Sequence, residues 1–133
     1  MKNVLSISII AIISLFMLQS CDSQKTVLDN VPDNKLDKTY TVKVGETFEI
    51  KMASNPTTGF KWEQTSKIKP RIIKEVDSKY IADDKSMSIV GKGGTQIFTF
   101  LAKKEGVLFI QYQYLKEGGK MDKEKYLKIE VQK

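Results

Sequence analysis

The sequence predicts an all-β domain, an antiparallel sandwich of about seven strands. Three observations support this prediction. Apolar and polar residues alternate with a period of two in several short runs, which is the pattern of half-buried strands. Turn residues such as glycine separate these runs. No stretch after the first 20 residues shows a clear helical period. About seven short strands in one domain of roughly 95 residues are typical of immunoglobulin-like sandwiches.

Residues 1–20 are predicted to be a targeting signal. They start with MKN and continue in the almost wholly apolar run VLSISIIAIISLFML. That run has the length of a signal-peptide core and is short for a membrane span. It ends in LQSC at residues 18–21, which resembles a bacterial lipobox, where a peptidase cuts before the cysteine and the thiol carries a lipid. The alternatives are an ordinary secretory signal and a lone transmembrane anchor.

Cys21 is the single cysteine of the chain. A lone thiol in an exported protein calls for a partner or a modification, and lipidation of Cys21 supplies one. We therefore expect a protein that is lipid-anchored in the bacterial cell envelope, on the periplasmic face or the cell surface. Residues 21–38 are polar, contain Pro32 and lack aromatic residues, which predicts a flexible tether. Residues 39–133 are then the folded domain, which we expect to be a monomer.

The predicted strands follow in order, each bounded by turn residues. Gly45 and Glu46 separate the first two runs, and Pro70 precedes a β-branched run. Trp62 is expected to be the aromatic residue that such sandwiches bury between their sheets. The predicted strands cover residues 40–44, 48–52, 61–64, 71–76, 95–102, 107–114 and 126–131.

The charge pattern argues against nucleic-acid binding. The net charge is +6, but lysine and acidic residues are mixed along the chain, and Arg71 is the only arginine. Nucleic-acid binding favours clustered basic residues with aromatic neighbours. We interpret most lysines as solvated strand faces. A weak attraction to anionic lipid or to an acidic partner is the alternative.

The residue types that carry most catalysis are missing or lack their usual context. The chain has no histidine and no cysteine beyond Cys21, and it contains no zinc motif. Asp83-Asp84 offers too few oxygen ligands for calcium. GKGG at residues 91–94 lacks the strand–helix context of a phosphate loop. The sequence predicts no metal, no cofactor and no enzymatic activity, so recognition is the expected class of function.

SNPTTGF, at residues 54–60, is an uncharged loop in a chain rich in charge. Pro56 has a fixed φ, which stiffens the turn, and Gly59 permits a backbone angle that other residues resist. Small threonines can enter a narrow cleft without burying a charge. In a seven-strand sandwich the loops after the second, fourth and sixth strands emerge at one end. Residues 54–60, 91–94 and 115–123 should therefore lie side by side.

Four segments resemble the chagasin family of cysteine-peptidase inhibitors: NPTTGF at 55–60, GKGGTQIFTF at 91–100, VGETFEI at 44–50 and SKYIADD at 78–84. The similarity extends over about residues 40–131. It implies an immunoglobulin-like sandwich that blocks papain-like cysteine peptidases reversibly and noncovalently, with three loops laid across the active-site cleft. Thr57 and Thr58 would be the central contacts, with Thr58 closest. The resemblance assigns peptidase binding to Asn55, Pro56, Thr57, Thr58, Gly59, Phe60, Gly91, Lys92, Gly93, Gly94, Tyr114, Leu115 and Lys116.

The third loop departs from the family pattern, in which Arg-Pro-Trp follows a tyrosine of the sixth strand. Tyr114-Leu115-Lys116 takes that place if Tyr112 is the family tyrosine, and Lys116-Glu117-Gly118 takes it if Tyr114 is. Neither register supplies tryptophan, which predicts weaker or differently targeted inhibition. Tyr114 either replaces the anchor in part or is a packed strand residue. The alternatives to inhibition are a noncatalytic immunoglobulin-like binding module of the cell envelope with a different partner, and a purely structural envelope lipoprotein.

Overall fold

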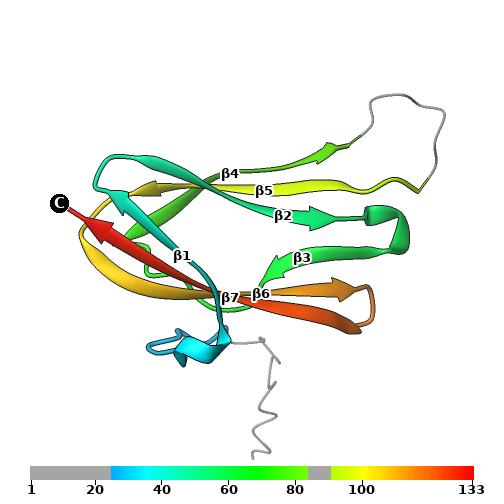
Figure 1. Ribbon diagram of the computed structural model, residues 1–133, viewed down its shortest axis with the longest axis horizontal. Helices are drawn as coiled ribbons and strands as arrows, with labels where there is room; N and C mark the ends of the chain where they lie inside the picture. Colours follow the sequence, from blue (N-terminus) through cyan, green and yellow to red (C-terminus); the bar gives the residue numbers. More distant parts are fainter. Residues whose placement is uncertain (1–24, 84–90) are drawn as a thin grey trace, which may run out of the picture.

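The computed structural model describes residues 25–83 and 91–133; the predicted signal, Cys21 and Asp84 lie outside these ranges. The described residues form two packed sheets, which confirms the predicted all-β sandwich (Figure 1). One sheet has the strand order β1-β7-β6-β3 and the other has the order β2-β5-β4. The elements are η1 (Asp33–Lys35), β1 (Leu36–Lys43), β2 (Thr47–Ser54), η2 (Pro56–Thr58), β3 (Phe60–Gln64), β4 (Ile73–Ala82), β5 (Gly94–Ala102), β6 (Gly106–Lys116) and β7 (Met121–Gln132).

One strand pair differs from the expected antiparallel pattern. β1 runs parallel to β7, with Tyr40 opposite Ile129 and Val42 opposite Val131, whereas the other paired strands are antiparallel. The cause is the turn after β1, which carries the chain across to the other sheet instead of forming a hairpin within one sheet. β1 is therefore free to lie beside the last strand, whose direction it shares.

The N-terminal boundary of the domain also differs from the expected one. Residues 25–38 were predicted as part of a tether, but β1 already begins at Leu36 and Val31 is only 4% exposed. Val27 and Leu28 form isolated bridges to Lys67 and Phe109. The apolar side chains of this otherwise polar segment favour its packing on the sandwich, because their burial removes apolar surface from water.

β4 extends to Ala82, six residues beyond the strand predicted at residues 71–76. Its side chains after Ile73 are exposed, so the sequence shows no alternation there. Backbone pairing with β5 continues through Tyr80–Gln96 to Ala82–Gly94 and holds the strand instead. β4 is the edge of its sheet, where side-chain burial is a poor guide to strand length.

The core lies between the inward faces of the two sheets. Along β6, alternate side chains point inward, and Trp62 of β3 is 2% exposed, which confirms its predicted core position. Aromatic rings meet across the layers, with the Phe98 and Tyr112 centroids 4.7 Å apart. The largest fully buried side chains are Tyr112, Phe100, Ile50, Ile73, Leu108, Ile110 and Ile129.

Tyr112→Phe is expected to leave the free energy of unfolding unchanged or to raise it by up to about 1 kcal/mol. The Tyr112 hydroxyl is buried and has no hydrogen-bond partner among the described residues. Burial, with smaller contributions from Glu75 and Tyr40, holds its pKa well above the usual range, so the hydroxyl stays neutral. Urea unfolding of the variant measures the change.

The matched control is Tyr114→Phe, because the Tyr114 hydroxyl accepts a hydrogen bond from the Asn55 N–H at 2.7 Å. This second variant should lose about 1 to 2 kcal/mol. An equal loss in both variants would show that the Tyr112 hydroxyl has a stabilising partner after all.

Candidate functional site

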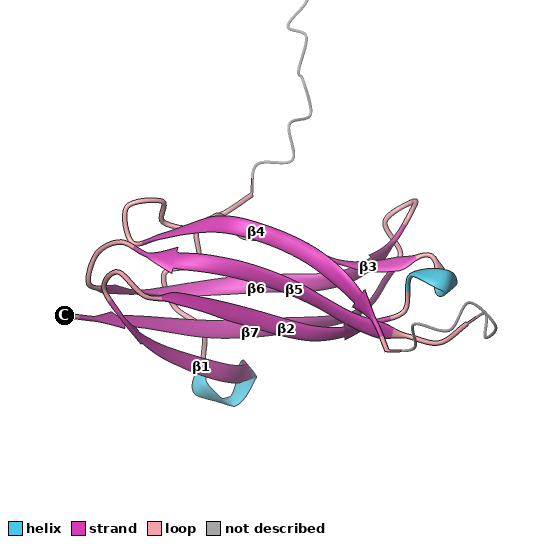
Figure 2. Cartoon of the chain, turned by 90° about the horizontal axis from the view of Figure 1, so that it is seen from above, coloured by secondary structure: helices cyan, strands magenta, loops and turns pink. Residues whose placement is uncertain are grey.

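The three segments singled out in the sequence meet at one end of the sandwich. Figures 1 and 2 show η2 at the end opposite the C-terminus, with the β6–β7 turn and the start of β5 at the same end. Asn55 connects the segments directly. Its side-chain Nδ2 donates to the Gly91 carbonyl at 3.1 Å, and its backbone N–H donates to the Tyr114 hydroxyl at 2.7 Å. The adjacency that the strand order predicted is therefore present.

The central loop, residues 55–59, is a single 3-10 turn with a hydrogen bond at nearly every step. Asn55 caps it, because its Oδ1 accepts from the Thr57 N–H at 3.2 Å and from the Thr57 hydroxyl at 2.5 Å. The Thr58 hydroxyl donates to the Asn55 carbonyl at 2.6 Å. Pro56 starts the turn with its φ already fixed, and Gly59 ends it at φ +80°. The loop is held in one shape before it meets any partner.

Both threonine side chains of this loop are exposed, and each hydroxyl hydrogen points back toward Asn55. Because each hydroxyl already donates its hydrogen bond within the turn, its oxygen lone pairs are free to accept hydrogen bonds from a partner. The tip therefore presents two small acceptor groups on a stiff backbone. The central loop itself carries no charged side chain.

Tyr114 supports the central loop from beneath and is not available as an exposed anchor. Its side chain is only 5% exposed, and its ring lies 5.4 Å from that of Phe60 and 5.0 Å from that of Trp62. Pairing of Tyr114 with Trp62 on β3 turns the ring into the sandwich. Of the two interpretations that the sequence left open, the packed strand residue is the one that the structure shows.

The second loop is packed closely against the end of β2. Gly91 adopts φ +98°, and a Cβ on Gly93 would lie 3.1 Å from the Ser54 carbonyl oxygen. Gly94 differs from the other candidate contacts of this loop because it is a buried residue of β5. A Cβ there would lie 2.3 Å from the Ile81 carbonyl oxygen. Gly94 thus permits the close approach of β4 and β5 and does not face outward.

The third loop is a short turn between β6 and β7. The Lys116 N–H donates to the Lys120 carbonyl and the Gly119 N–H donates to the Lys116 carbonyl, each at 2.9 Å. Gly118 and Gly119 have φ of +91° and +85°, which favour glycine. Leu115 is half-buried and Lys116 is exposed, so these two candidate contacts remain on the surface.

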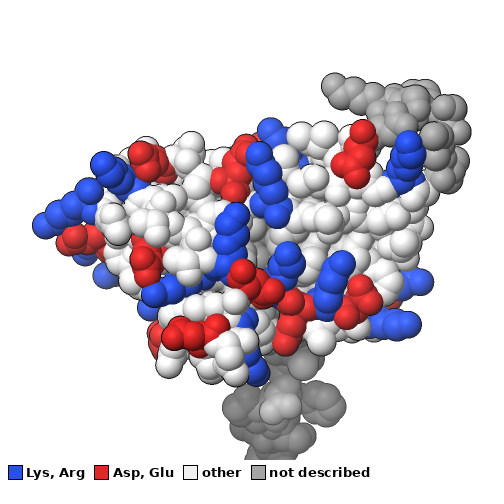
Figure 3. Space-filling view, viewed as in Figure 1, with Lys and Arg blue, Asp and Glu red and all other residues white. Residues whose placement is uncertain are grey.

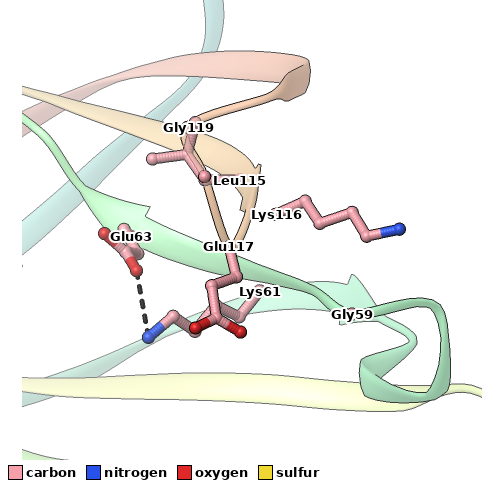
Figure 4. Close-up of a pocket in the computed structure, with 8 residues that line it drawn as sticks. Gly59, Lys61, Glu63, Leu115, Lys116, Glu117 and Gly119 are labelled. Carbon is pink, nitrogen blue, oxygen red and sulfur yellow. Dashed lines mark ion pairs between the residues drawn. The ribbon is translucent and has the colours of Figure 1, made fainter.

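A groove of about 460 Å³ separates the central loop from the third loop (Figure 4). Lys61 and Glu63 form an ion pair on its wall, with 3.0 Å between Nζ and Oε1. Lys116 extends away from this pair in Figure 4. The residues that line the groove are Gly59, Lys61, Glu63, Leu115, Lys116, Glu117, Gly118 and Gly119.

Two supporting contacts could not be read from the sequence. The Gln96 side chain bonds both backbone groups of Trp62, accepting from its N–H and donating to its carbonyl, each at 3.0 Å. Lys123 Nζ lies 4.8 Å from the centre of the Tyr114 ring. The first contact joins β3 and β5, which are far apart in the chain, and the second joins the two strands of the β6–β7 hairpin. No local motif marks either contact. Within the described ranges, no group of three or more His, Cys, Asp and Glu side chains is placed to hold a metal.

Residues 41–131 match the family model for the chagasin family of peptidase inhibitors, I42. Chagasin of Trypanosoma cruzi is 37% identical over 93 residues, which are 66% of this chain and 83% of that protein. A cysteine protease inhibitor from Entamoeba histolytica shares the fold, with a TM-score of 0.61 and 16% identity over 75% of this chain and 91% of its own. PbICP-C, solved in complex with falcipain-2, also shares the fold, with a TM-score of 0.54 and 20% identity over 81% of this chain and 99% of its own. This chain belongs to the chagasin family of peptidase inhibitors.

Proposed function

We propose that this protein is a reversible, noncovalent inhibitor of papain-like cysteine peptidases. The observation that carries the proposal is the NPTTG turn, which is exposed, uncharged and held rigid by Asn55 at the end where three loops meet. Family membership supports it, and one protein of the same fold is solved with the peptidase falcipain-2. The target is a host enzyme or a peptidase of the same organism.

In the proposed complex, Thr57 and Thr58 enter the active-site cleft. A cleft that holds a thiolate and an imidazolium offers hydrogen-bond donors, and the two hydroxyls have their lone pairs free to accept. The internal hydrogen bonds of the turn reduce the entropy lost on binding. Because no charged group lies at the tip of the loop, binding in the cleft buries no unpaired charge.

The location of the binding surface at one end suits an anchored protein. We propose that residues 1–20 are removed as a lipoprotein signal and that Cys21 carries the lipid, which holds the domain at the bacterial cell envelope. No helix in the described part of the chain is long and apolar enough to cross a membrane.

An inhibition titration tests the proposed function. The chain without residues 1–20 is titrated against papain and a cathepsin L-type enzyme, with and without a small inhibitor that occupies the active site. Competition between the two inhibitors is the expected result. Binding that persists when the active site is filled would favour the binding-module alternative, to which the buried Tyr114 and the absence of tryptophan from the third loop lend support.

Lys116→Trp is expected to tighten inhibition by about tenfold or more, since an aromatic anchor can contribute roughly 2 kcal/mol to an interface. Lys116 stands where the family places tryptophan if Tyr112 is the family tyrosine, and its side chain is exposed. It also adjoins the central loop, because its Cε lies 3.3 Å from the point where a Cβ on Gly59 would be. The inhibition constants of variant and wild type measure the effect.

The matched control for this variant is Lys120→Trp, which places the same ring on the far side of the turn. Tighter inhibition by the Lys116→Trp protein only would support the alignment in which Tyr112 is the family tyrosine. Equal inhibition constants for the Lys116→Trp protein and the wild type would contradict it.

A further inference from the structure

The end of the sandwich opposite the binding loops is strongly basic. Four segments form this basal end: residues 43–46, 65–72 and 103–105, and the C-terminal residues 132–133. Hydrogen bonds join them in pairs: the Ile72 carbonyl accepts from the Lys103 N–H at 2.7 Å, and the Gln132 carbonyl accepts from the Val44 N–H at 2.9 Å. These segments carry two acidic residues, Glu46 and Glu105, and seven basic ones: Lys43, Lys67, Lys69, Arg71, Lys103, Lys104 and Lys133. Two of the lysines are paired, Lys69 with Asp29 of the N-terminal segment at 3.5 Å and Lys133 with Glu105 at 4.0 Å.

The described connections at the binding end show no such excess. Residues 55–59, 83, 91–93 and 115–120 contain three basic side chains, Lys92, Lys116 and Lys120, and two acidic ones, Asp83 and Glu117. Figure 3 shows blue side chains projecting at the left end of the molecule, where the C-terminus lies in Figure 1. Of these two sets of connecting segments, the basal one therefore has the larger excess of basic side chains.

The basal end also exposes apolar surface among these charges. A groove of about 420 Å³ lies between the N-terminal segment and the β3–β4 connection. Val27, at its edge, is 37% exposed, and Val44 and Val107 of the same end are 43% and 46% exposed. The residues that line this groove are Val27, Ile68, Lys69, Pro70, Arg71, Ile72, Lys104 and Glu105. Apolar side chains ringed by long cationic ones are typical of surfaces that rest in the interface of a membrane.

The chain length between the proposed lipid and this groove keeps the two close. Five residues lie between Cys21 and Val27, so a fully extended link of six residue steps spans at most roughly 20 Å. Val27 is fixed to the domain by its bridge to Lys67. A lipid on Cys21 would therefore hold the basal end within a short distance of the bilayer.

We propose that the basal end docks on the surface of an anionic phospholipid bilayer, with the groove residues at the interface and Lys67, Arg71 and Lys104 facing the headgroups. This inference rests on the lipid anchor proposed above. Negative headgroups attract basic residues close to the membrane, and a patch of this kind is the usual second signal beside a lipid chain. β6 has 11 residues and spans roughly 35 Å, so the binding loops would point away from the bilayer toward soluble peptidases.

The test uses the full chain, acylated at Cys21, in nanodiscs of phosphatidylethanolamine and phosphatidylglycerol or of phosphatidylcholine alone. Lysines are acetylated at limiting reagent, and mass spectrometry measures the rate at each site. Lys67 and Lys104 are expected to react roughly threefold or more slowly in the anionic discs, whereas Lys61 and Lys120 keep their rates. High salt should remove the difference, because it screens the attraction.

Arg71→Glu with Lys104→Glu reverses two exposed charges of the basal end, and it should abolish the protection of Lys67. The matched control, Lys61→Glu with Lys120→Glu, makes the same change in net charge at the opposite end and should keep it. Circular dichroism confirms that both variants are folded. Equal rates in the two lipids, or protection that depends on protein concentration as a contact between two copies would, overturns the proposal.

The mass of the N-terminal peptide reports acylation separately. A chain that is not acylated at Cys21 would overturn the anchor and the docking together, while the inhibition titration would be unaffected. Loss of inhibition in a chain that still docks would instead overturn the proposed function.

Discussion

Thr58→Arg is expected to weaken inhibition of a papain-like peptidase on the order of 100-fold or more. The Thr58 side chain is exposed at the tip of the central loop, and its hydroxyl bonds only its own turn, through the Asn55 carbonyl at 2.6 Å. An arginine there would be too long for a narrow cleft and would bring a charge that the cleft has to desolvate. The inhibition constant from a titration gives the effect directly.

The fold should tolerate this change, which makes the result a statement about binding. The Thr58 backbone N–H still donates to the Asn55 carbonyl at 3.1 Å, and the Asn55 side chain still caps the turn through Thr57. Thr41→Arg is the matched control, since Thr41 is an exposed threonine of β1 outside the three-loop end. Wild-type inhibition by the Thr58→Arg protein would show that the central loop does not enter the cleft.

Strands whose one face is buried were predictable, and strands without such a face were not. β2 alternates strictly between exposed and buried residues, so its sequence carries the period-2 signal. β4 is buried only at Ile73, and its length depends on backbone pairing with β5, which leaves no trace in the local sequence. The parallel placement of β1 is likewise a property of the whole sheet, because it depends on where the last strand lies.

The site shows the same division between local and nonlocal information. The shape of the central loop follows from Asn55, Pro56 and Gly59, which are neighbours in the sequence and act within one turn. The roles of Tyr114 and Gly94 follow from cross-strand pairing, since Tyr114 faces Trp62 and Gly94 approaches Ile81. A family motif marks which segments belong to the site, but burial decides which of their residues are free to touch a partner.

Trp62→Ala is expected to lower the free energy of unfolding by about 3 to 5 kcal/mol, the usual cost of removing a buried tryptophan side chain. Trp62 is 2% exposed, and its Nε1 donates to the Ala53 carbonyl at 2.9 Å, which joins the two sheets. For a domain of this size the melting temperature should fall by roughly 15 °C. Calorimetry or urea unfolding measures the loss.

Inhibition by the remaining folded Trp62→Ala protein should also weaken, because Trp62 packs at 5.0 Å against Tyr114, whose hydroxyl holds Asn55. Trp62→Phe separates the two contributions, since it keeps an aromatic ring in the core but leaves the Ala53 carbonyl without its donor. That variant should lose about 1 to 3 kcal/mol and keep most of its inhibition. A cost below 1 kcal/mol for Trp62→Ala would contradict the expected contribution of the buried ring. Unchanged inhibition by the folded Trp62→Ala protein would mean that the ring does not link the core to the central loop.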